Sequence, residues 1–265
     1  MTSRALITGS TGTVGRALRA HLESSGWDVG GWNREDVPID DYGRMEAYVG
    51  DAKPTALFHL AVASQPTQTP LPAEQAWQVN YEWTSELAWI TRQLGIPFVF
   101  TSTVMVFTEA IPGPYTIAMR PDAAHDYGRD KRKGEERVFA QNPNARVARL
   151  GWQIGEGTEG NQMAAWLAEH RTVAASTRWL PACSMLDDTA AALEQVATSR
   201  PGLYHVDSNE GWSFFDIAMA LRDRAKADWT IKPTFGRAYD QRLLDPRLDV
   251  PRLGERLSEL RSARR

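Results

Sequence analysis

The chain has a single cysteine, Cys183, among its 265 residues. One cysteine excludes a disulfide within the chain and a metal site built on several cysteines, and it is typical of proteins in a reducing compartment. No apolar run approaches the length of a membrane-spanning helix, and the N-terminus lacks the pattern of a signal peptide. We therefore expect a cytoplasmic protein.

An excess of positive charge is also missing. The formal net charge is −3, with 42% hydrophobic and 24% charged residues. This composition is typical of a globular protein with a large core, and it gives no general attraction to nucleic acid or to a membrane surface. His170 and His205 have no metal-ligand spacing. We predict a small-molecule substrate as partner, with no nucleic acid, membrane or metal, and leave a homodimer open.

Glycines gather where the first predicted strand ends. The apolar run Ala5–Ile7 leads to Gly9, Gly12 and Gly15 in the spacing G-x-x-G-x-x-G. In a dinucleotide site the first glycine permits a tight turn, the second lets the backbone approach a pyrophosphate, and the third lets the next helix pack closely. A plain strand–helix turn is the alternative, and the position after a first strand favours the dinucleotide site. The contacts expected here are Gly9, Thr11, Gly12, Thr13 and Val14.

Strand-like and helical segments alternate along the chain. The predicted strands are 4–8, 27–32, 55–60, 98–101, 145–150 and 202–206, and the predicted helices include 13–25, 73–94 and 127–140. The alternation predicts an α/β fold with a doubly wound parallel sheet of Rossmann type. We assign 1–150 to an NADP-binding domain, to which 182–207 returns, and 151–181 with 208–265 to a smaller C-terminal substrate-binding lobe. In that lobe Ser213 is expected to cap helix 213–225, and 249–260 is predicted to be the last helix.

The residues at the end of the second predicted strand indicate which dinucleotide the site prefers. Asn33 and Arg34 stand where a dinucleotide fold meets the adenosine ribose. An acidic residue there would bind a 2′-hydroxyl, whereas an arginine favours a 2′-phosphate, so this pair favours NADP(H) over NAD(H). Glu35 and Asp36 follow at once and weaken the preference if either folds back. A solvated loop charge is the other interpretation of Arg34.

Chemistry-bearing side chains follow the fourth predicted strand. Thr101, Ser102 and Thr103 place hydroxyls at its carboxyl end, and Tyr127 and Lys131 stand at the head of a helix. Residues i and i+4 share one helical face, and an ammonium close to a phenol lowers the pKa of the phenol. A packed tyrosine beside a solvated lysine is the alternative. The order of the features along the chain favours a catalytic pair.

Together these segments resemble the extended short-chain dehydrogenase/reductase family over nearly the full length, and within it the dTDP-4-dehydrorhamnose reductase-like branch. The resemblance implies hydride transfer from NADPH to the ketone of a nucleotide-linked 4-keto sugar or a related carbonyl metabolite. The matching segments are the glycine turn, Ile39-Asp40, 74–80, Ser102-Thr103 with Val106-Phe107, 127–131 with Gly134-Glu135, and 202–205.

The resemblance also implies roles for single residues. Tyr127 would protonate the developing alkoxide, Lys131 would bind the nicotinamide ribose and lower the pKa of Tyr127, and Thr103 would bond the substrate carbonyl. Asn80 would lie near the nicotinamide and Asp40 near the adenine. The remaining predicted cofactor contacts are Asn33, Arg34, Leu60, Ala61, Val62 and Thr101. The remaining predicted substrate contacts are Ser64, Val104, Trp152 and Arg178.

One departure from the branch leaves the substrate open. The branch reads S-T-D-Y-V-F at 102–107, and here Val104 and Met105 replace an acid and an aromatic residue. The change favours a less polar carbonyl compound, such as a natural-product intermediate that is reduced or epimerised with NADP. A non-catalytic NADP(H)-binding regulatory protein is a further alternative, although Tyr127 and Lys131 are both present.

Two smaller questions stay open. His59 ends a predicted strand, and we interpret it as a residue of the core or of the cleft wall. Three arginines in the second half of the chain have two equally consistent interpretations. They bind a diphosphate through paired hydrogen bonds, or they are structural ion-pair partners. These arginines are Arg178, Arg242 and Arg247.

Overall fold

The computed structural model describes residues 3–63, 72–156, 160 and 162–262, and the chain divides into two compact units. The first unit consists of Met1–Thr108, Pro121–Arg149 and Leu193–Tyr204. The second unit consists of Glu109–Arg120, Leu150–Ala192 and His205–Arg265.

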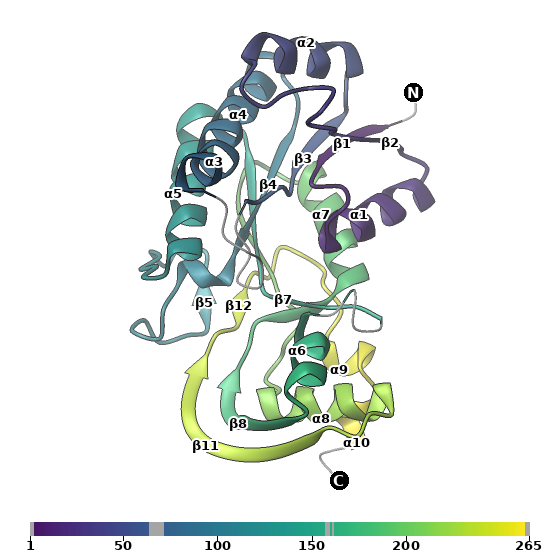
Figure 1. The fold of residues 1–265 in the computed structure, drawn as a ribbon, viewed down its shortest axis with the longest axis vertical. Coiled ribbons are helices and arrows are strands. Elements are labelled where there is room, and N and C mark those ends of the chain that lie inside the picture. Colours follow the sequence, from purple (N-terminus) through teal and green to yellow (C-terminus); the bar gives the residue numbers. More distant parts are fainter. Residues whose placement is uncertain (1–2, 64–71, 157–159, 161, 263–265) are drawn as a thin grey trace. The chain divides into compact units, whose positions relative to one another are not determined.

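A six-stranded sheet of Rossmann type forms the centre of the first unit (Figure 1). Its strand order is β10-β6-β4-β3-β1-β2, and β1 pairs in parallel with both β2 and β3. The predicted α/β doubly wound fold is therefore confirmed. The direction in which successive strands are added to the sheet reverses between β1 and β3. Ligands of such sheets bind at the carboxyl ends of the strands beside this reversal. The strands are β1 (Arg4–Thr8), β2 (Asp28–Gly31), β3 (Ala56–His59), β4 (Phe98–Thr103), β6 (Arg146–Leu150) and β10 (Gly202–Val206).

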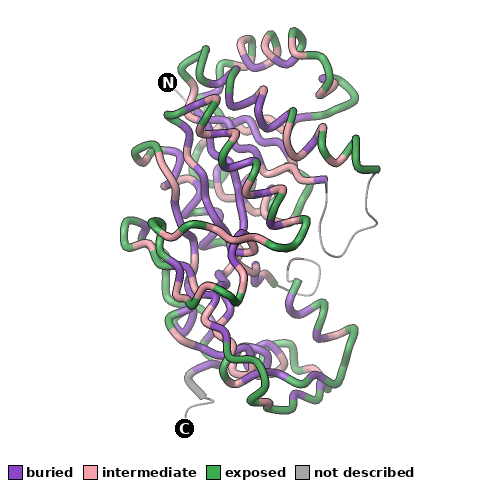
Figure 2. Tube along the Cα trace, turned by 90° about the vertical axis from the view of Figure 1, so that its left-hand side faces the viewer, coloured by how far each residue is buried: buried purple, intermediate pink, exposed green. Residues whose placement is uncertain are grey.

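Helices cover both faces of this sheet (Figure 1). On one face α1 (Thr13–Ser24) lies beside α7 (Leu186–Thr198), where His21 Nε2 is 2.7 Å from Glu194 Oε2. The other face carries α2 (Tyr42–Ala52), α4 (Trp83–Gln93) and α5 (Asp126–Gln141). Figure 2 shows the buried residues concentrated along the strands, where Phe58, Phe98 and Phe100 are almost fully buried. Burial of these apolar faces is the main stabilising contribution to the layered fold.

The predicted strands and the helices 13–25 and 127–140 are confirmed to within two residues at each end. The helix predicted over 73–94 is confirmed in extent, since the chain is helical from Ala73 to Gln93, but it consists of three consecutive helical segments. These are α3 (Ala73–Trp77), a π-helical turn η1 (Gln78–Glu82) and α4. A π-helical turn interrupts the regular side-chain spacing of an α-helix and is frequent at functional sites. Asn80 lies within this turn.

The second unit is built on three small two-stranded sheets. Their pairs are β7 (Trp152–Ile154) with β9 (Cys183–Met185), β8 (Thr172–Leu180) with β11 (Thr230–Asp240), and β5 (Tyr115–Thr116) with β12 (Leu243–Leu244). Helices α6 (Gln162–His170) and α8 (Phe214–Ala225) contribute to its apolar core. The predicted cap of α8 is confirmed, since Ser213 Oγ accepts from the N–H of Asp216 and the Asp216 carboxylate accepts from the N–H of Ser213.

The last helix predicted over 249–260 is wrong. The chain forms two short helices, α9 (Leu253–Arg256) and α10 (Glu259–Ser262), and Leu257 between them leaves the helical backbone region. The helix also begins later than predicted, because Pro251 disfavours helical geometry at the residue before it. Across the residues that the structure describes, no helix is long and apolar enough to cross a membrane.

Candidate functional site

The glycine turn after β1 leaves no room for larger side chains. Gly9 has φ +69°, and a Cβ on it would lie 2.8 Å from the backbone nitrogen of Ala61. A Cβ on Gly15 would lie 2.8 Å from Ser10 Cα, so α1 packs directly against the turn. Gly12 is the N-cap of α1 and is exposed. Its N–H donates to the carbonyl oxygen of Gly9 at 3.0 Å. The turn and the helix N-terminus therefore fit the cradle that a dinucleotide pyrophosphate requires.

A buried histidine links the two strands on either side of the reversal. His59, the last residue of β3, is fully buried, and its Nδ1 lies 2.7 Å from Thr8 Oγ1 at the end of β1. Its Nε2 lies 2.8 Å from Thr84 Oγ1 in α4. Burial, with a smaller contribution from the charge of Lys131, lowers the pKa of His59 to about 3. The ring is therefore neutral at physiological pH, and its place in the core is confirmed.

The directions of the hydrogen bonds made by the two threonine hydroxyls determine which nitrogen of the His59 ring carries the proton. Thr84 Oγ1 donates its proton to the carbonyl of Asn80 at 3.1 Å, so it accepts from His59 Nε2. His59 Nδ1 then accepts from the Thr8 hydroxyl. The bonds therefore run in one direction from β1 through β3 to α4. This relay, formed by Thr8, His59 and Thr84, is a feature that sequence reasoning missed.

The relay also holds the loop that follows β3. Thr8 Oγ1 accepts from the backbone N–H groups of Leu60 and Ala61 at 3.2 and 3.3 Å. Asn80 Oδ1 accepts from the N–H of Ala63 at 2.8 Å. The predicted cofactor contacts Leu60, Ala61 and Asn80 are thus tied to one another and to the end of β1. Val62 is half-buried in this loop, and Ser64 lies outside the described residues.

Thr103 and Tyr127 come together between the end of β4 and the start of α5. The Thr103 side chain is hydrogen-bonded to the Tyr127 phenol, and Thr103 Oγ1 also accepts from the N–H of Met105 at 3.2 Å. Burial raises the pKa of Tyr127 to about 12, and the bond with Thr103 opposes that rise. The phenol is therefore protonated at neutral pH and is able to act as an acid.

Lys131 is buried one helical turn after Tyr127. Its Nζ donates to the carbonyl of Thr101 at 2.9 Å and lies 4.7 Å from the centre of the Phe100 ring. Burial lowers the pKa of Lys131 to about 8, and the nearby carboxylate of Glu135 opposes that shift. Lys131 is not among the groups that shift the pKa of Tyr127, and that pKa is raised by burial, so the expected lowering by Lys131 is not found.

A buried ion pair beneath Lys131 supports β4 and α5. Arg149 donates from Nε and Nη2 to the Glu135 carboxylate at 2.9 and 2.7 Å, and both side chains are less than a tenth exposed. Ser102 Oγ donates to the same carboxylate. Arg149 also lies over the Phe107 ring, with its guanidinium carbon 5.0 Å from the ring centre. The sequence indicates Glu135 only as part of the family motif, and this cluster was not predicted.

The loop after β2 leaves Arg34 exposed. The Asn33 amide donates to the Asp36 carboxylate at 2.7 Å, and Asn33 Oδ1 accepts from the N–H of Glu35 at 3.1 Å. Asp36 therefore folds back onto Asn33 and not onto Arg34. Within the described part of the chain, Arg34 has no hydrogen-bonding or ionic partner, and Asp40 is exposed just before α2.

Of the predicted substrate contacts, one is in the core of the first unit and two belong to the second unit. Val104 is only 3% exposed in the short helical turn η2 (Val104–Val106), so it offers a ligand little surface. Trp152 lies in β7 and Arg178 in β8, and both belong to the second unit.

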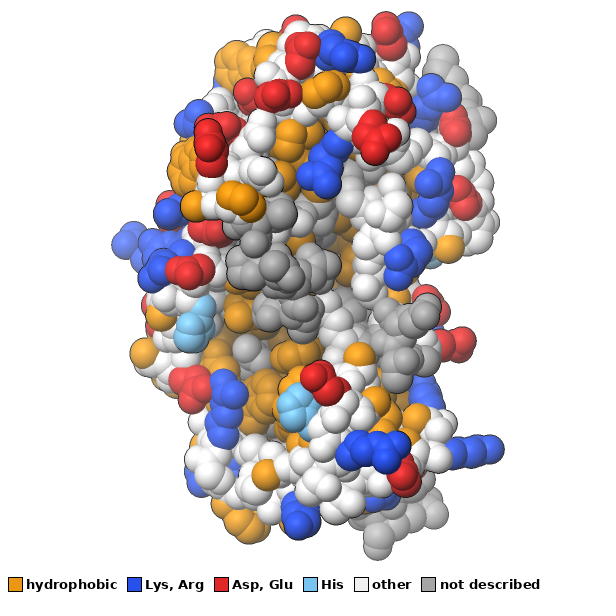
Figure 3. Space-filling model, viewed as in Figure 1, with side chains coloured by type: hydrophobic (Ala, Val, Ile, Leu, Met, Phe, Trp, Pro, Cys, Tyr) orange, Lys and Arg blue, Asp and Glu red, His pale blue; other side chains and the backbone are white. Residues whose placement is uncertain are grey.

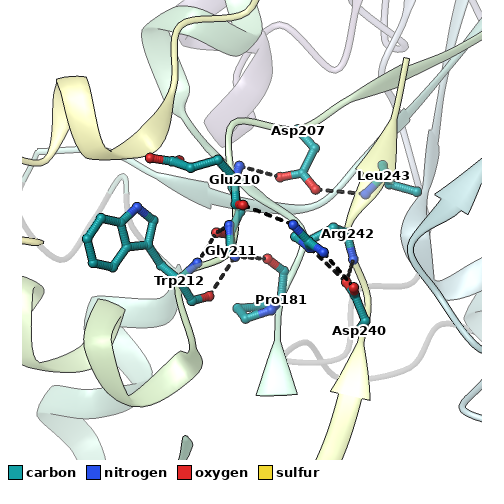
Figure 4. A network of polar contacts seen from close by, with 9 residues as sticks. Pro181, Asp207, Glu210, Gly211, Trp212, Asp240, Arg242 and Leu243 are labelled. Atoms are coloured by element: carbon teal, nitrogen blue, oxygen red, sulfur yellow. Dashed lines mark hydrogen bonds and ion pairs between the residues drawn. The ribbon is translucent and has the colours of Figure 1, made fainter. Parts of the chain in front are cut away.

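Arg242 and Arg247 are structural ion-pair partners. Arg242 donates from Nε and Nη2 to Asp240 at 2.9 and 2.7 Å and from Nη1 to the carbonyl of Glu210 at 3.0 Å (Figure 4). Arg247 makes the same two-point contact with Asp245 at 2.7 and 2.6 Å. Both pairs follow an Asp-x-Arg spacing, which was the signal available in the sequence.

Comparison with known proteins identifies the class. Residues 3–250 match the model of the RmlD substrate binding domain, so the chain belongs to that family. The family lies within the extended short-chain dehydrogenase/reductases, which are NAD(P)-dependent oxidoreductases.

Two relatives of similar identity are a reductase and a subunit of another enzyme. The chain is 27% identical over 240 residues to dTDP-4-dehydrorhamnose reductase of Aggregatibacter actinomycetemcomitans, covering 85% of this chain and 80% of that protein. It is 26% identical over 239 residues to methionine adenosyltransferase 2 subunit beta of Xenopus laevis, covering 83% of this chain and 71% of that protein.

Solved structures share the fold. The dTDP-4-dehydrorhamnose reductase of Bacillus anthracis in complex with NADP superposes with a TM-score of 0.82 at 20% identity, covering 99% of this chain and all of that one. The enzyme WbmG of Bordetella bronchiseptica in complex with NAD gives a TM-score of 0.73 at 19% identity, covering 93% and 86% of the two chains.

Proposed function

We propose that this protein is an NADPH-dependent reductase that transfers a hydride to the ketone of a nucleotide-linked 4-keto sugar or a related carbonyl metabolite. Tyr127 is the proton donor in this proposal. The family and the dTDP-4-dehydrorhamnose reductase relative support the reaction class. A less polar carbonyl substrate remains the alternative, because Val104 and Met105 supply neither the acid nor the aromatic residue of the resembled branch.

The residues of the first unit fit the cofactor that this reaction needs. The pyrophosphate would lie on the turn at Gly9 and Gly12, and the loop held by Thr8 and Asn80 would line the nicotinamide side. Arg34 has an exposed guanidinium that would bind a 2′-phosphate, which favours NADP(H) over NAD(H). Bound NADPH would supply the hydride, and the chain would supply orientation and the proton.

The hydrogen-bonded pair of Thr103 and Tyr127 is the observation that carries the proposal. The phenol has a pKa of about 12, so it is protonated at neutral pH. As negative charge develops on a carbonyl oxygen, the phenol would donate its proton to it, and the Thr103 hydroxyl would stabilise the resulting phenolate. In this proposal Lys131, on the same helical face, would bind the nicotinamide ribose.

Tyr127→Phe tests the proposal, because it removes the proton and keeps the ring. NADPH oxidation is followed with a panel of 4-keto nucleotide sugars, beside titrations of NADPH binding. Turnover should fall at least about 100-fold while the NADPH Kd stays within about twofold. Tyr81→Phe is the control, at a half-buried tyrosine of the first unit, and it should leave turnover and the NADPH Kd unchanged. Turnover that survives in Tyr127→Phe would show that the assigned acid is wrong.

A non-catalytic NADP(H)-binding subunit is the second candidate. The similarity to methionine adenosyltransferase 2 subunit beta, whose name makes it a subunit of another enzyme, favours it. Wild-type protein that binds NADPH tightly and turns over neither the keto sugars nor less polar ketones would support this candidate. Turnover of any of these compounds by the wild type would reject it.

A further inference from the structure

Three charged side chains of α5 and β6 lie inside the first unit. Figure 3 shows charged side chains spread over the surface, whereas Lys131, Glu135 and Arg149 are only 7%, 5% and 2% exposed. Charged groups are almost never buried so deeply unless an opposite charge accompanies them. Glu135 is the only acid of the three, so one carboxylate accompanies two buried cations.

The carboxylate of Glu135 is fixed by three hydrogen bonds. Arg149 donates to its two oxygens, from Nε at 2.9 Å and from Nη2 at 2.7 Å. Ser102 Oγ donates to the oxygen that also accepts from Arg149 Nε. Two-point contact with a guanidinium fixes the orientation of a carboxylate as well as compensating its burial. The negative charge is therefore held at one place beside α5.

Lys131 stands one helical turn before Glu135 on the same face of α5. Its Nζ donates to the carbonyl of Thr101 at 2.9 Å and has no other hydrogen-bond partner in the described part of the chain. An ammonium has three N–H donors, so two of them are left for a ligand. Burial lowers the pKa of Lys131 to about 8, and the charge of Glu135 opposes that shift.

The other ionisable groups close to Lys131 bring no negative charge at neutral pH. Tyr127 on the same helix is a neutral phenol with a pKa of about 12. His59 at the end of β3 is a neutral imidazole with a pKa of about 3, which the charge of Lys131 helps to lower. Arg149 is a second cation. Stabilisation of the ammonium therefore falls to Glu135.

The elements packed against α5 do not replace that charge. β4 and η2 pack against α5 and contain no ionisable side chain. η1 and α4 also pack against it, and their ionisable side chains are exposed or half-buried, where solvent screens them. These side chains are Tyr81, Glu82, Glu86 and Arg92.

We propose that Glu135 is a positioning residue that keeps Lys131 charged and so sets the upper end of the pH range over which the site binds its dinucleotide. The ligand in this inference, a dinucleotide whose ribose hydroxyls accept from Lys131, rests on the proposed function. A neutral amine has one donor fewer than an ammonium and no charge, so binding weakens as Lys131 loses its proton. Without the charge of Glu135, that loss occurs at lower pH.

Carbon-13 NMR of the lysine side chains measures the pKa of Lys131 without cofactor, and Lys131→Arg assigns its signal. Glu135→Gln keeps an acceptor for Arg149 and removes the charge, so it should lower the pKa of Lys131 by about 1 or more. Glu135→Asp keeps the charge but withdraws it by one methylene, and should lower that pKa by a smaller amount. Glu136→Gln, at an exposed acid of the same helix, is the matched control and should leave it unchanged.

An equal pKa of Lys131 in Glu135→Gln and in the wild type would overturn the proposal. If Glu135→Gln does not fold, Glu135→Asp decides in its place, because an unchanged pKa there would also overturn it. A wild-type Lys131 that is already neutral at pH 7 would do the same.

Titration of NADPH binding across pH gives the second readout. The wild-type Kd should rise as the pH passes about 8, and in Glu135→Gln the rise should begin about one pH unit lower or more, with the two curves converging in mild acid. A merely structural role of Glu135 would weaken binding equally at every pH, and that result would overturn the proposal. Absence of NADPH binding in the wild type would instead contradict the proposed function, since the NMR measurement involves no cofactor.

Discussion

The hydroxyl of Thr8 and Nδ1 of His59 lie 2.7 Å apart, which joins the last residue of β1 to the last residue of β3. The same histidine reaches Thr84 in α4, one turn beyond Asn80. The glycine turn and the loop after β3 are thus held by one buried relay. Because Thr8, His59 and Thr84 are each no more than 1% exposed, we infer that the relay positions the predicted cofactor contacts without touching the cofactor.

His59→Leu should therefore weaken NADPH binding as well as the fold. It leaves the Thr8 hydroxyl without its acceptor, so we expect the NADPH Kd to rise about tenfold and the free energy of unfolding to fall by about 1–3 kcal/mol. Thr91→Val is the control, since Thr91 is equally buried in α4 and its hydroxyl bonds to the carbonyls of Leu87 and Ala88 and to the Asn142 amide, none of which belongs to the relay. It should lower stability and leave the Kd unchanged. An equal effect of both variants on the Kd would show that the relay has no positioning role.

Stability should fall in acid through the same histidine. The folded-state pKa of His59 is about 3, whereas the unfolded value is about 6.5. Between these values only the unfolded chain binds the proton, so this contribution is complete above about pH 6.5 and is lost as the pH falls toward 3, by at most about 1.4 kcal/mol per pH unit. Urea unfolding of the wild type and of His59→Asn at several pH values measures it. The difference in stability between them should shrink as the pH falls, and a constant difference would contradict the assignment.

Glu135→Ala should be among the most destabilising changes in the first unit. It leaves the buried guanidinium of Arg149 without its carboxylate, which we expect to cost about 3–5 kcal/mol in the free energy of unfolding. Glu136→Ala removes an exposed ion pair with Arg132 in the same helix and should cost less than about 1 kcal/mol. Chemical denaturation of both variants checks the prediction. Similar losses would show that the buried pair contributes no more than the exposed one.

Arg34→Ser should change the choice of cofactor. Loss of a guanidinium that binds the 2′-phosphate should raise the NADPH Kd about 10-fold to 100-fold and leave the NADH Kd unchanged. Arg4→Ser removes the same charge at the amino end of β1, opposite the glycine turn, and is the control. A matching rise for NADPH and NADH in Arg34→Ser would show that Arg34 does not select between them.

Much of the candidate site could be predicted because its signals are local. The turn at Gly9 depends on a positive φ and on contacts with its nearest elements, and the cap at Ser213 depends on a residue three positions away. Tyr127 and Lys131 share a helical face through their spacing alone. The strand–helix alternation was likewise sufficient to predict the parallel sheet.

Only the tertiary structure decided what each buried polar group contacts. The partners of His59 are 51 and 25 positions away, and Lys131 reaches a carbonyl 30 positions away in place of the phenol on its own helix. The pairing of Glu135 with Arg149 likewise joins α5 to β6. Dihedral preference, capping and periodicity act between near neighbours, so the sequence by itself determined the turns and elements. Strand order and burial act on the whole chain at once, so the long-range hydrogen bonds and the pKa values appear only when it is folded.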